Sequence, residues 1–344
     1  MLDSIEDKLF VIAHENQIPL DVDIELLTKC NMRCRHCYIP SHTSDGLPFD
    51  VLMDIFMQLR KLGTMNLTLT GGEIFLRKDI LDIIKAARTF GFRVTLLTNA
   101  SLLNDELITE LKKLHINMLG ISLYSLNEVV YNSITQTNNL FHRVVNNILK
   151  CKQAGISVRI NTPLMNLNKD FNELEKFCKT NGFIFNVSQV ILPKTNGDNS
   201  NQNLAINEND FETLNVRLFE REHTNLTENS FNMLELYPDE PCPTLKTTLL
   251  IDSSGDVYPC SSMHFKVGNI YQEKLRDIIF NDALQNIRNI KKSELVKCST
   301  CEMKQYCSRC PGLIYEESRN LYGCSKTVKA IAASYLKYKK EVEI

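Results

Sequence analysis

The chain of 344 residues is 43% hydrophobic and carries a formal net charge of −2 at pH 7. A chain of this length and apolar content can bury a large core, which favours one large domain and a smaller one. Its charged residues are dispersed, which excludes the basic stripe of a nucleic-acid-binding protein and the acidic block of a disordered tail. The first residues do not form a signal peptide, and no apolar run approaches the ~20 residues that span a bilayer. We therefore expect a soluble, cytoplasmic protein that binds neither nucleic acid nor membranes.

An N-terminal helical extension is expected over residues 1–20, and from residue 21 onward short apolar runs alternate with longer stretches of helical period. Six runs predict strands at residues 22–27, 67–70, 93–98, 118–123, 158–161 and 185–190. The stretches between them predict helices at residues 50–62, 79–90, 105–114, 140–154 and 171–180. Several of these helices begin near an Asp or Asn that can cap them. Such alternation predicts an α/β fold with six βα units and a parallel sheet, either doubly wound or curved as a barrel.

The rest of the chain predicts a linker and a smaller domain. Residues 193–236 are expected to bridge the two domains, and the Asn-rich stretch 193–203 is interpreted as a solvated linker, with a lid over the site as the alternative. The smaller domain is expected over residues 237–344, with a strand, a turn and a strand within 251–260. Amphipathic helices are predicted at 211–222 and 327–340.

Twelve cysteines fall into two groups, three within residues 30–37 and seven between residues 242 and 324, with two left over. Because the cytosol keeps ordinary thiols reduced, this many cysteines without an export signal indicate metal or redox chemistry. Cys151 and Cys178 stand apart on predicted helices, and we interpret them as small buried hydrophobic residues.

The first group is the run Cys30-Asn-Met-Arg-Cys34-Arg-His-Cys37. A closed zinc site takes four ligands, whereas a 4Fe–4S cluster held by three cysteines keeps one iron free. The run resembles the cluster motif of radical S-adenosylmethionine (SAM) enzymes, with His36 at a position that is aromatic in that family. The resemblance implies a partial (β/α)6 barrel of the TIM type over residues 21–192, with its chemistry at the carboxyl ends of the strands. It also implies that Cys30, Cys34 and Cys37 hold a catalytic cluster that binds SAM and cleaves it to a 5′-deoxyadenosyl radical.

Further SAM contacts are implied at the ends of the next strands. The run Thr70-Gly71-Gly72-Glu73 resembles the family's GGE motif, in which the carboxylate binds the SAM amino group. From the residues alone, glycines at such a turn let a ligand approach the backbone closely. An arginine that often binds the SAM carboxylate in relatives is absent from residues 131–139, and Arg159 or Asn161 are candidates to replace it. The other positions that the resemblance assigns to SAM binding are His36, Tyr38, Asn99, Ser122 and Asn161.

The C-terminal cysteines resemble a SPASM domain, the auxiliary-cluster module of many radical SAM enzymes, although two rather than three residues separate Cys307 from Cys310. The resemblance implies three 4Fe–4S clusters in all, two of them auxiliary. The first auxiliary cluster would be held by Cys242, Cys260 and Cys310, and the second by Cys298, Cys301, Cys307 and Cys324. Either Asp239 or Glu240 completes the first, or one iron stays open to substrate. Spacing alone leaves one or two zinc sites as an alternative.

SPASM-containing relatives act mostly on peptides, so we expect an enzyme that abstracts hydrogen from a ribosomally made peptide and forms a thioether or other cross-link. The alternatives are modification of a small molecule, protein oxidation of the sulfatase-maturase kind, and a zinc-stabilised binding protein without enzymatic activity. Fewer than thirty residues precede Cys30, so we expect a leader-recognition domain to be either a separate protein or unnecessary. An electron donor such as flavodoxin or ferredoxin is the other expected partner.

Overall fold

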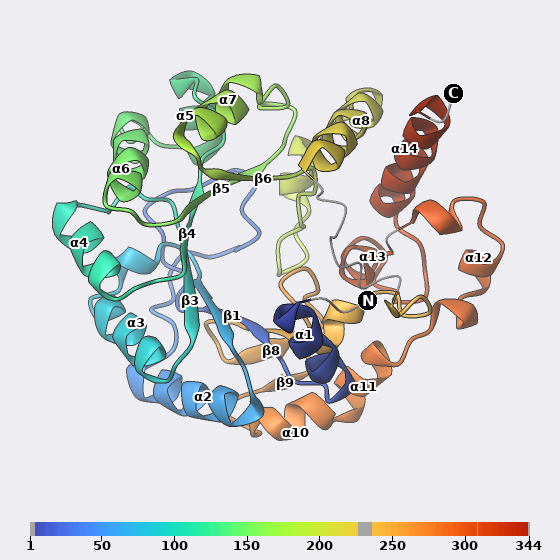
Figure 1. The fold of residues 1–344 in the computed structure, drawn as a ribbon, viewed down its shortest axis with the longest axis horizontal. Helices are drawn as coiled ribbons and strands as arrows, with labels where there is room; N and C mark the ends of the chain where they lie inside the picture. Colours follow the sequence, from blue (N-terminus) through green and yellow to red (C-terminus); the bar gives the residue numbers. More distant parts are fainter. Residues whose placement is uncertain (1–3, 226–235, 308, 343–344) are drawn as a thin grey trace.

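The computed structural model describes residues 4–225, 236–307 and 309–342. Six strands lie side by side in one sheet, each parallel to its neighbours: β1 (Asp21–Glu25), β2 (Asn66–Thr70), β3 (Arg93–Thr98), β4 (Met118–Ser122), β5 (Val158–Pro163) and β6 (Ile184–Ser188). The helices between them are α2 (Phe49–Leu62), α3 (Ile80–Thr89), α4 (Asp105–Lys113), α5 (Glu128–Thr135), α6 (Phe141–Gln153) and α7 (Asn172–Asn181). Figure 1 shows these helices around the outside of a curved sheet. The predicted α/β fold, a partial barrel of six parallel strands, is confirmed.

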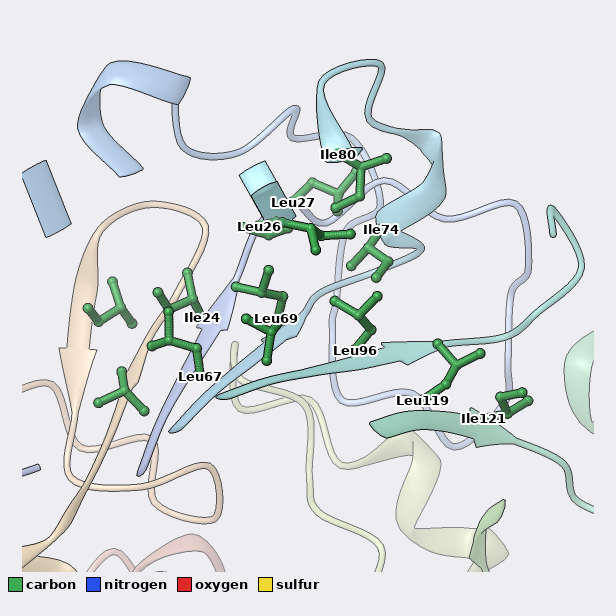
Figure 2. Packing of buried hydrophobic residues seen from close by; sticks show 14 of the residues in the cluster. Ile24, Leu26, Leu27, Leu67, Leu69, Ile74, Ile80, Leu96, Leu119 and Ile121 are labelled. Carbon is green, nitrogen blue, oxygen red and sulfur yellow. The ribbon is translucent and has the colours of Figure 1, made fainter. Parts of the chain in front are cut away.

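Apolar residues at alternate positions along the strands form the core between the sheet and its helices. Val22 and Ile24 of β1 and Leu67 and Leu69 of β2 are at most 1% exposed. Figure 2 shows Ile24, Leu67 and Leu69 beside the labelled side chains of β3 and β4. Val22 and Phe56 of α2 belong to the same cluster. Each buried aliphatic side chain contributes about 1.5–3 kcal/mol of transfer free energy, so this layer holds the strand ends in place.

The concave face of strands β1 to β6, which we call the lumen, carries polar side chains. Asp23 of β1 interacts electrostatically with Arg159 of β5 and hydrogen bonds with Thr68 and Ser261. Because β2, β3 and β4 lie between β1 and β5 in the sheet, the interaction between Asp23 and Arg159 crosses the hollow of the curve. Burial raises the pKa of Asp23, while these hydrogen bonds and Arg159 act in the opposite direction.

The C-terminal part of the chain continues the same sheet. Strand β7 (Thr248–Ile251) pairs in parallel with the other side of β1, and β8 (Asp256–Tyr258) and β9 (Gly268–Asn269) follow in antiparallel order. The strand–turn–strand expected within 251–260 is present, with its first strand three residues earlier than predicted. The pairing of β7 with β1 was not predicted, because it joins segments that are distant in the sequence.

The remaining helices are α1 (Ile5–Glu15), α8 (Glu208–Asn225), α10 (Leu275–Phe280), α11 (Asp282–Arg288), α12 (Val296–Ser299), α13 (Pro311–Ser318) and α14 (Lys326–Val342). The expected N-terminal helix is α1, and the two predicted C-terminal helices are α8 and α14, which pack together. Residues 226–235 of the expected linker lie outside the described residues. Within the described ranges, no helix has the length and apolar character needed to cross a bilayer.

The predicted helix caps are only partly correct. Asn104 caps α4 by accepting a hydrogen bond from the backbone of Leu107 at 2.8 Å. Asp79 precedes α3 but makes no capping bond, because its carboxylate pairs with Arg77 at 2.7 Å. Helix α5 was missed altogether; the Asn127 side chain caps it, and its eight residues are too few for a clear periodic signal.

Backbone hydrogen bonds fix the loop that follows β1, residues 26–48, against the turn that follows β2. The backbone nitrogen of Gly72 donates to the carbonyl of Leu27 at 2.9 Å, and that of Glu73 donates to Lys29 at 2.8 Å. A Cβ atom on Gly72 would lie 2.1 Å from the Lys29 carbonyl oxygen, and one on Gly71, whose φ is +140°, would lie 2.3 Å from that of Leu27. We expected these glycines to admit a ligand, whereas the space beside their α-carbons is filled by the protein's own backbone.

Gly72→Ala tests this close approach. The added methyl group meets backbone atoms that cannot rotate away, so we expect the free energy of unfolding to fall by about 3 kcal/mol. Gly323→Ala is the control, since its nearest neighbours would lie at 3.4 Å and it has an ordinary φ. Chemical denaturation of both variants measures the difference, and equal losses in the two would contradict the steric explanation.

Candidate functional site

The loop after β1 brings Cys30, Cys34 and Cys37 together at the carboxyl end of the sheet. Burial, together with the neighbouring Cys37 and Cys30 thiols, raises the pKa of the Cys34 thiol to about 12. The pKa of Cys37 is raised to about 11 by burial, with Cys30 adding to the effect. The three thiols therefore share one poorly solvated space, as the sequence predicts.

This donor set fits an iron–sulfur cluster. Burial raises the pKa of all three half-buried thiols, and Cys30 adds to the effect at both Cys34 and Cys37, so a cation among them favours the thiolate forms. None of the three is in a disulfide. Among the residues that the structure describes, no three metal-ligating side chains converge on the position of a single ion. A cubane takes one ligand on each of several iron atoms, so its cysteines stand further apart than the ligands of one ion.

The end of β3 supports the cysteine loop from one side. The Asn99 side-chain nitrogen lies 3.9 Å from the Cys30 sulfur and donates to the Asn31 side chain at 2.9 Å. Ser101 accepts a hydrogen bond from Asn31 at 2.8 Å and donates to Asn99 at 2.6 Å. Asn99, predicted from the sequence as a SAM contact, thus lies beside the first cluster cysteine.

Glu73 is the one carboxylate of the predicted SAM motif, and it is fully buried. Its oxygens accept hydrogen bonds from the Thr98 hydroxyl and the Asn99 backbone, both at 2.7 Å. Burial raises its pKa while these donors lower it. A carboxylate oriented in this way beside Cys30 has the charge to pair with an ammonium group.

The segment just after strand β4 contributes a contact that the sequence analysis missed. The Tyr124 hydroxyl lies 3.8 Å from the Cys34 sulfur, and the rings of Tyr124 and His36 meet edge to face at 4.9 Å. The available signal was that Tyr124 directly follows a predicted strand, two residues after Ser122. Ser122, which hydrogen bonds with Tyr124, pairs in register with Asn161 of β5 at the same edge of the sheet.

The Asn-rich segment is not simply a solvated linker. Asn201 is 2% exposed and donates a hydrogen bond to the His36 carbonyl at 3.1 Å. The backbone of Thr195 donates to the Tyr38 carbonyl at 3.0 Å. The segment therefore packs on the cysteine loop, which is the position expected for its alternative interpretation as a lid.

A buried chain of polar and aromatic side chains links the cysteine loop to the C-terminal part. The Tyr38 hydroxyl donates to Glu25 of β1, and the Tyr38 ring stacks on His264 at 5.7 Å. Glu316 of α13 accepts a hydrogen bond from the His264 backbone at 2.7 Å. Burial raises the pKa of Glu25 to about 7. Tyr38, expected to contact SAM, is thus engaged with Glu25, which the sequence analysis did not single out.

The C-terminal cysteines form two neighbourhoods. Burial and the nearby thiols of Cys310 and Cys242 raise the pKa of Cys260 to about 12, and Asp23 of the lumen is also within electrostatic reach. The members of the other neighbourhood are Cys298, Cys301, Cys307 and Cys324. This grouping is the same as the one implied by the resemblance. Cys151 and Cys178 are buried elsewhere, in the helices of the barrel.

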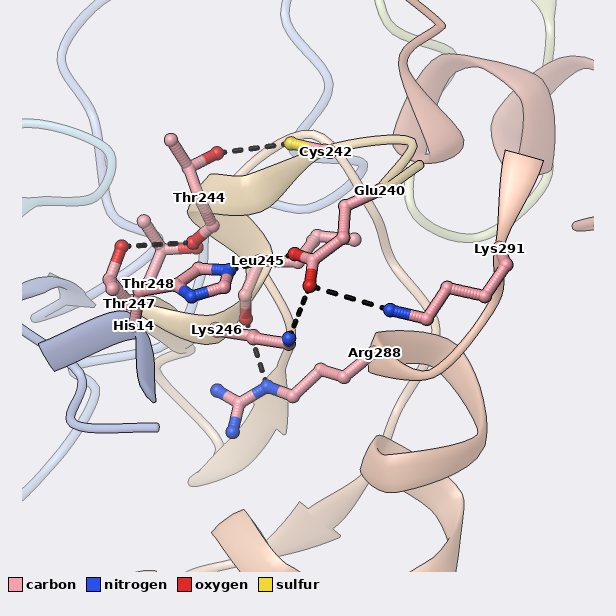
Figure 3. A network of polar contacts seen from close by, with 10 residues as sticks. All are labelled: His14, Glu240, Cys242, Thr244, Leu245, Lys246, Thr247, Thr248, Arg288 and Lys291. Carbon is pink, nitrogen blue, oxygen red and sulfur yellow. Dashed lines mark hydrogen bonds and ion pairs between the residues drawn. The ribbon is translucent and has the colours of Figure 1, made fainter. Parts of the chain in front are cut away.

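Both candidate fourth ligands of the first neighbourhood are engaged with other groups. Figure 3 shows Glu240 between Lys246, Lys291 and His14, whose ring nitrogen lies 2.7 Å from the carboxylate. Asp239 accepts hydrogen bonds from the backbone and hydroxyl of Ser293, both at 2.8 Å. Either carboxylate would have to leave these partners to bind a metal.

Glu25→Gln tests the ionisation of the buried carboxylate. Between the ordinary pKa of 4.5 and the raised value of about 7, the folded protein keeps a proton that the unfolded chain has lost. The stability of the wild type therefore falls as the pH rises through this window and is constant above it. We expect Glu25→Gln to gain up to ~3 kcal/mol over the wild type between pH 4.5 and 7.5.

Thermal unfolding at several pH values, under anaerobic conditions, measures this gain. Glu106→Gln, at an exposed position on α4, is the control and should follow the wild type. Parallel pH profiles for Glu25→Gln and the wild type would show that Glu25 does not titrate in this range.

Comparison with known proteins agrees with this geometry. Residues 24–179 match the family model of the radical SAM superfamily, and residues 242–311 match that of the SPASM iron–sulfur cluster-binding domain. The AdoMet-dependent heme synthase of Methanosarcina barkeri is 23% identical over 85% of this chain and 90% of that protein. A GTP 3′,8-cyclase of Clostridium perfringens is 32% identical over 44% of this chain and 48% of the cyclase, so the chain spans about half of that relative.

Solved structures share the fold. Streptococcus suis SuiB bound to the precursor peptide SuiA superposes with a TM-score of 0.71 at 20% identity, covering 94% of this chain and 80% of SuiB. The protein anSMEcpe with bound AdoMet and the Kp18Cys peptide gives a TM-score of 0.72 at 16% identity, covering 94% of this chain and 98% of that one. With a radical SAM match around the first cysteine group and a SPASM match around the second, this chain belongs to the radical SAM superfamily, in the branch of enzymes that carry a SPASM domain.

Proposed function

We propose that this enzyme cleaves SAM at a cluster held by Cys30, Cys34 and Cys37, and that the resulting radical abstracts hydrogen from a peptide. The observation that carries this proposal is the convergence of three half-buried thiols with the buried Glu73 carboxylate at one edge of the sheet. When bound, the cluster supplies the electron that cleaves SAM. The residues around it position SAM and keep water from the radical.

Three of the predicted SAM contacts, Glu73, Ser122 and Asn161, have a definite task in this proposal. Glu73 binds the amino group, because Thr98 and Asn99 orient its carboxylate and burial strengthens the ion pair. Ser122 and Asn161, paired across β4 and β5, are placed to hydrogen bond with the rest of SAM. Tyr124 packs against Cys34 and His36 and shields that side of the cluster.

The polar lumen supports a peptide as the substrate. Asp23, Thr68 and Arg159 line its inner surface, and a peptide entering the lumen brings amide groups that need hydrogen-bond partners. The Arg159 side chain has one buried nitrogen, Nε, without a partner among the described residues. Two proteins of the same fold, SuiB and anSMEcpe, were crystallised with peptides. A separate leader-binding protein and a flavodoxin or ferredoxin complete the proposal.

Two auxiliary 4Fe–4S clusters are proposed at the two C-terminal neighbourhoods. Cys298, Cys301, Cys307 and Cys324 complete one cluster, whereas Cys242, Cys260 and Cys310 leave one iron without a cysteine. Because Asp239 and Glu240 are held by other partners, we favour an open iron over a carboxylate ligand. Thiolates are natural ligands of iron, so a substrate cysteine is the expected occupant.

A small molecule is the second candidate substrate. The similarity to the heme synthase of Methanosarcina barkeri favours this candidate, because the match extends over 85% of this chain. A short precursor-peptide gene beside this one would favour the peptide. Incubation of that peptide with the enzyme, SAM and a reductant, followed by mass spectrometry, tests it directly; an unmodified peptide, with SAM still being cleaved, would favour the small molecule.

Replacement of Cys30, Cys34 and Cys37 by Ala should abolish 5′-deoxyadenosine formation. The iron content should fall from about twelve to about eight per chain, since each cubane holds four irons. Cys151→Ala, at a buried cysteine that belongs to none of the three proposed clusters, should keep both the iron and the activity. Iron and sulfide counting after anaerobic reconstitution, EPR with and without SAM, and chromatography of the nucleoside products provide the measurements. Zinc in place of iron in the wild type would contradict the proposed function.

A further inference from the structure

Arg309 is a buried cation between the two auxiliary neighbourhoods. It lies in the sequence between Cys307 and Cys310 and is 4% exposed. One nitrogen of its guanidinium, Nη2, donates to the carbonyl of Leu321 and, at 3.3 Å, to that of Gly323. The other two nitrogens, Nε and Nη1, are buried and have no hydrogen-bond partner of good geometry among the described residues.

A buried charge with unused donors is costly unless a group of opposite charge faces it. The guanidinium lies against the thiol of Cys298 and interacts electrostatically with Cys307 and Cys324. These are three of the four cysteines of the second neighbourhood. Protonated thiols are weak hydrogen-bond acceptors, whereas thiolates and the sulfides of a cluster are negatively charged. A cluster would therefore supply the acceptors that the Arg309 guanidinium lacks.

We propose that Arg309 donates hydrogen bonds to the sulfurs of the second auxiliary cluster and raises the reduction potential of that cluster. The inference rests on the proposed presence of that cluster. Reduction adds one negative charge to a cluster, and a fixed positive charge with N–H donors stabilises the reduced form more than the oxidised form. The second cluster is therefore a stronger electron acceptor with Arg309 beside it than without it.

The orientation of the guanidinium explains why the second cluster is affected more than the first. Its Nη2 is anchored on the carbonyls of Leu321 and Gly323, which immediately precede Cys324. The thiols that act on the guanidinium are those of Cys298, Cys307 and Cys324, and all three belong to the second neighbourhood. Arg309 thus distinguishes two clusters whose ligands alternate along the chain.

The test uses protein in which Cys30, Cys34 and Cys37 are replaced by Ala, so that only the auxiliary clusters remain. Potentiometric titration followed by EPR gives one reduction couple for each cluster, and the couple that disappears in Cys298→Ala is assigned to the second. In Arg309→Met, we expect the equilibrium constant for reduction of the second cluster to fall about tenfold, a shift of about 59 mV to lower potential. Arg309→Lys keeps the charge but not the planar fork of donors, so its shift should be smaller.

Arg288→Met is the matched control. Arg288 is 3% exposed, and its Nε donates to the carbonyl of Leu245 at 2.9 Å, so its loss also removes a buried guanidinium. It should lower thermal stability and leave the second couple unchanged.

Iron counting separates failure of this inference from failure of the proposed function. Fewer than about eight irons in the starting protein would contradict the proposed pair of auxiliary clusters. With both clusters present, an unchanged second couple in Arg309→Met, or an equal shift of both couples, would overturn the role of Arg309. Loss of the second cluster from both Arg309 variants would assign the residue to cluster assembly and would also overturn it.

Discussion

The partial burial of three thiols in the loop after β1 is the constraint on which the site depends. Cys30, Cys34 and Cys37 resist ionisation because burial disfavours the thiolate, and at Cys34 and Cys37 a neighbouring thiol adds to this effect. Only a cation placed among them reverses this balance, so formation of the site and uptake of metal are coupled. The surrounding residues hold the three thiols in this arrangement. Backbone pairing with Gly72 and Glu73 fixes the loop, while Asn99 and Tyr124 lie beside the sulfurs.

The continuity of the sheet places the second set of cysteines relative to the first. Because β7 pairs with β1, the segment after β8 returns over the lumen, where Ser261 hydrogen bonds with Asp23 and His264 stacks on Tyr38. The paired strands β1 and β7 therefore support the cysteine loop on one side and the Cys260 neighbourhood on the other. A substrate in the lumen would lie between them, within the shared polar surface rather than between two loosely joined domains.

The sequence predicted what depends on local pattern. Strands β1 to β6 followed from short apolar runs and the cysteine neighbourhoods from family spacing, because both signals lie within short stretches of chain. What it missed depends on contacts between distant segments: the pairing of β7 with β1, the position of Tyr124 against Cys34, and the burial of Glu25 under Tyr38. Asp79 is placed like a helix cap, but its carboxylate pairs with Arg77 instead. Arg77 also donates a hydrogen bond to the carbonyl of Leu47 at the end of the cysteine loop. Local rules fail here because tertiary partners compete for the same polar groups.

The two auxiliary neighbourhoods differ in ways that suit different tasks. Cys260 of the first is within electrostatic reach of Asp23 in the lumen, and the two candidate carboxylate ligands, Asp239 and Glu240, are bound to a serine, two lysines and a histidine. An iron left without a protein ligand there would face the substrate. The second has four cysteines and a buried arginine beside them, and it adjoins α14 rather than β1. A cluster that contacts substrate must keep a free position, whereas one that stores an electron gains from a complete ligand set and a nearby cation. The asymmetry of the cysteines and the placement of Arg309 therefore favour substrate binding at the first and electron storage at the second.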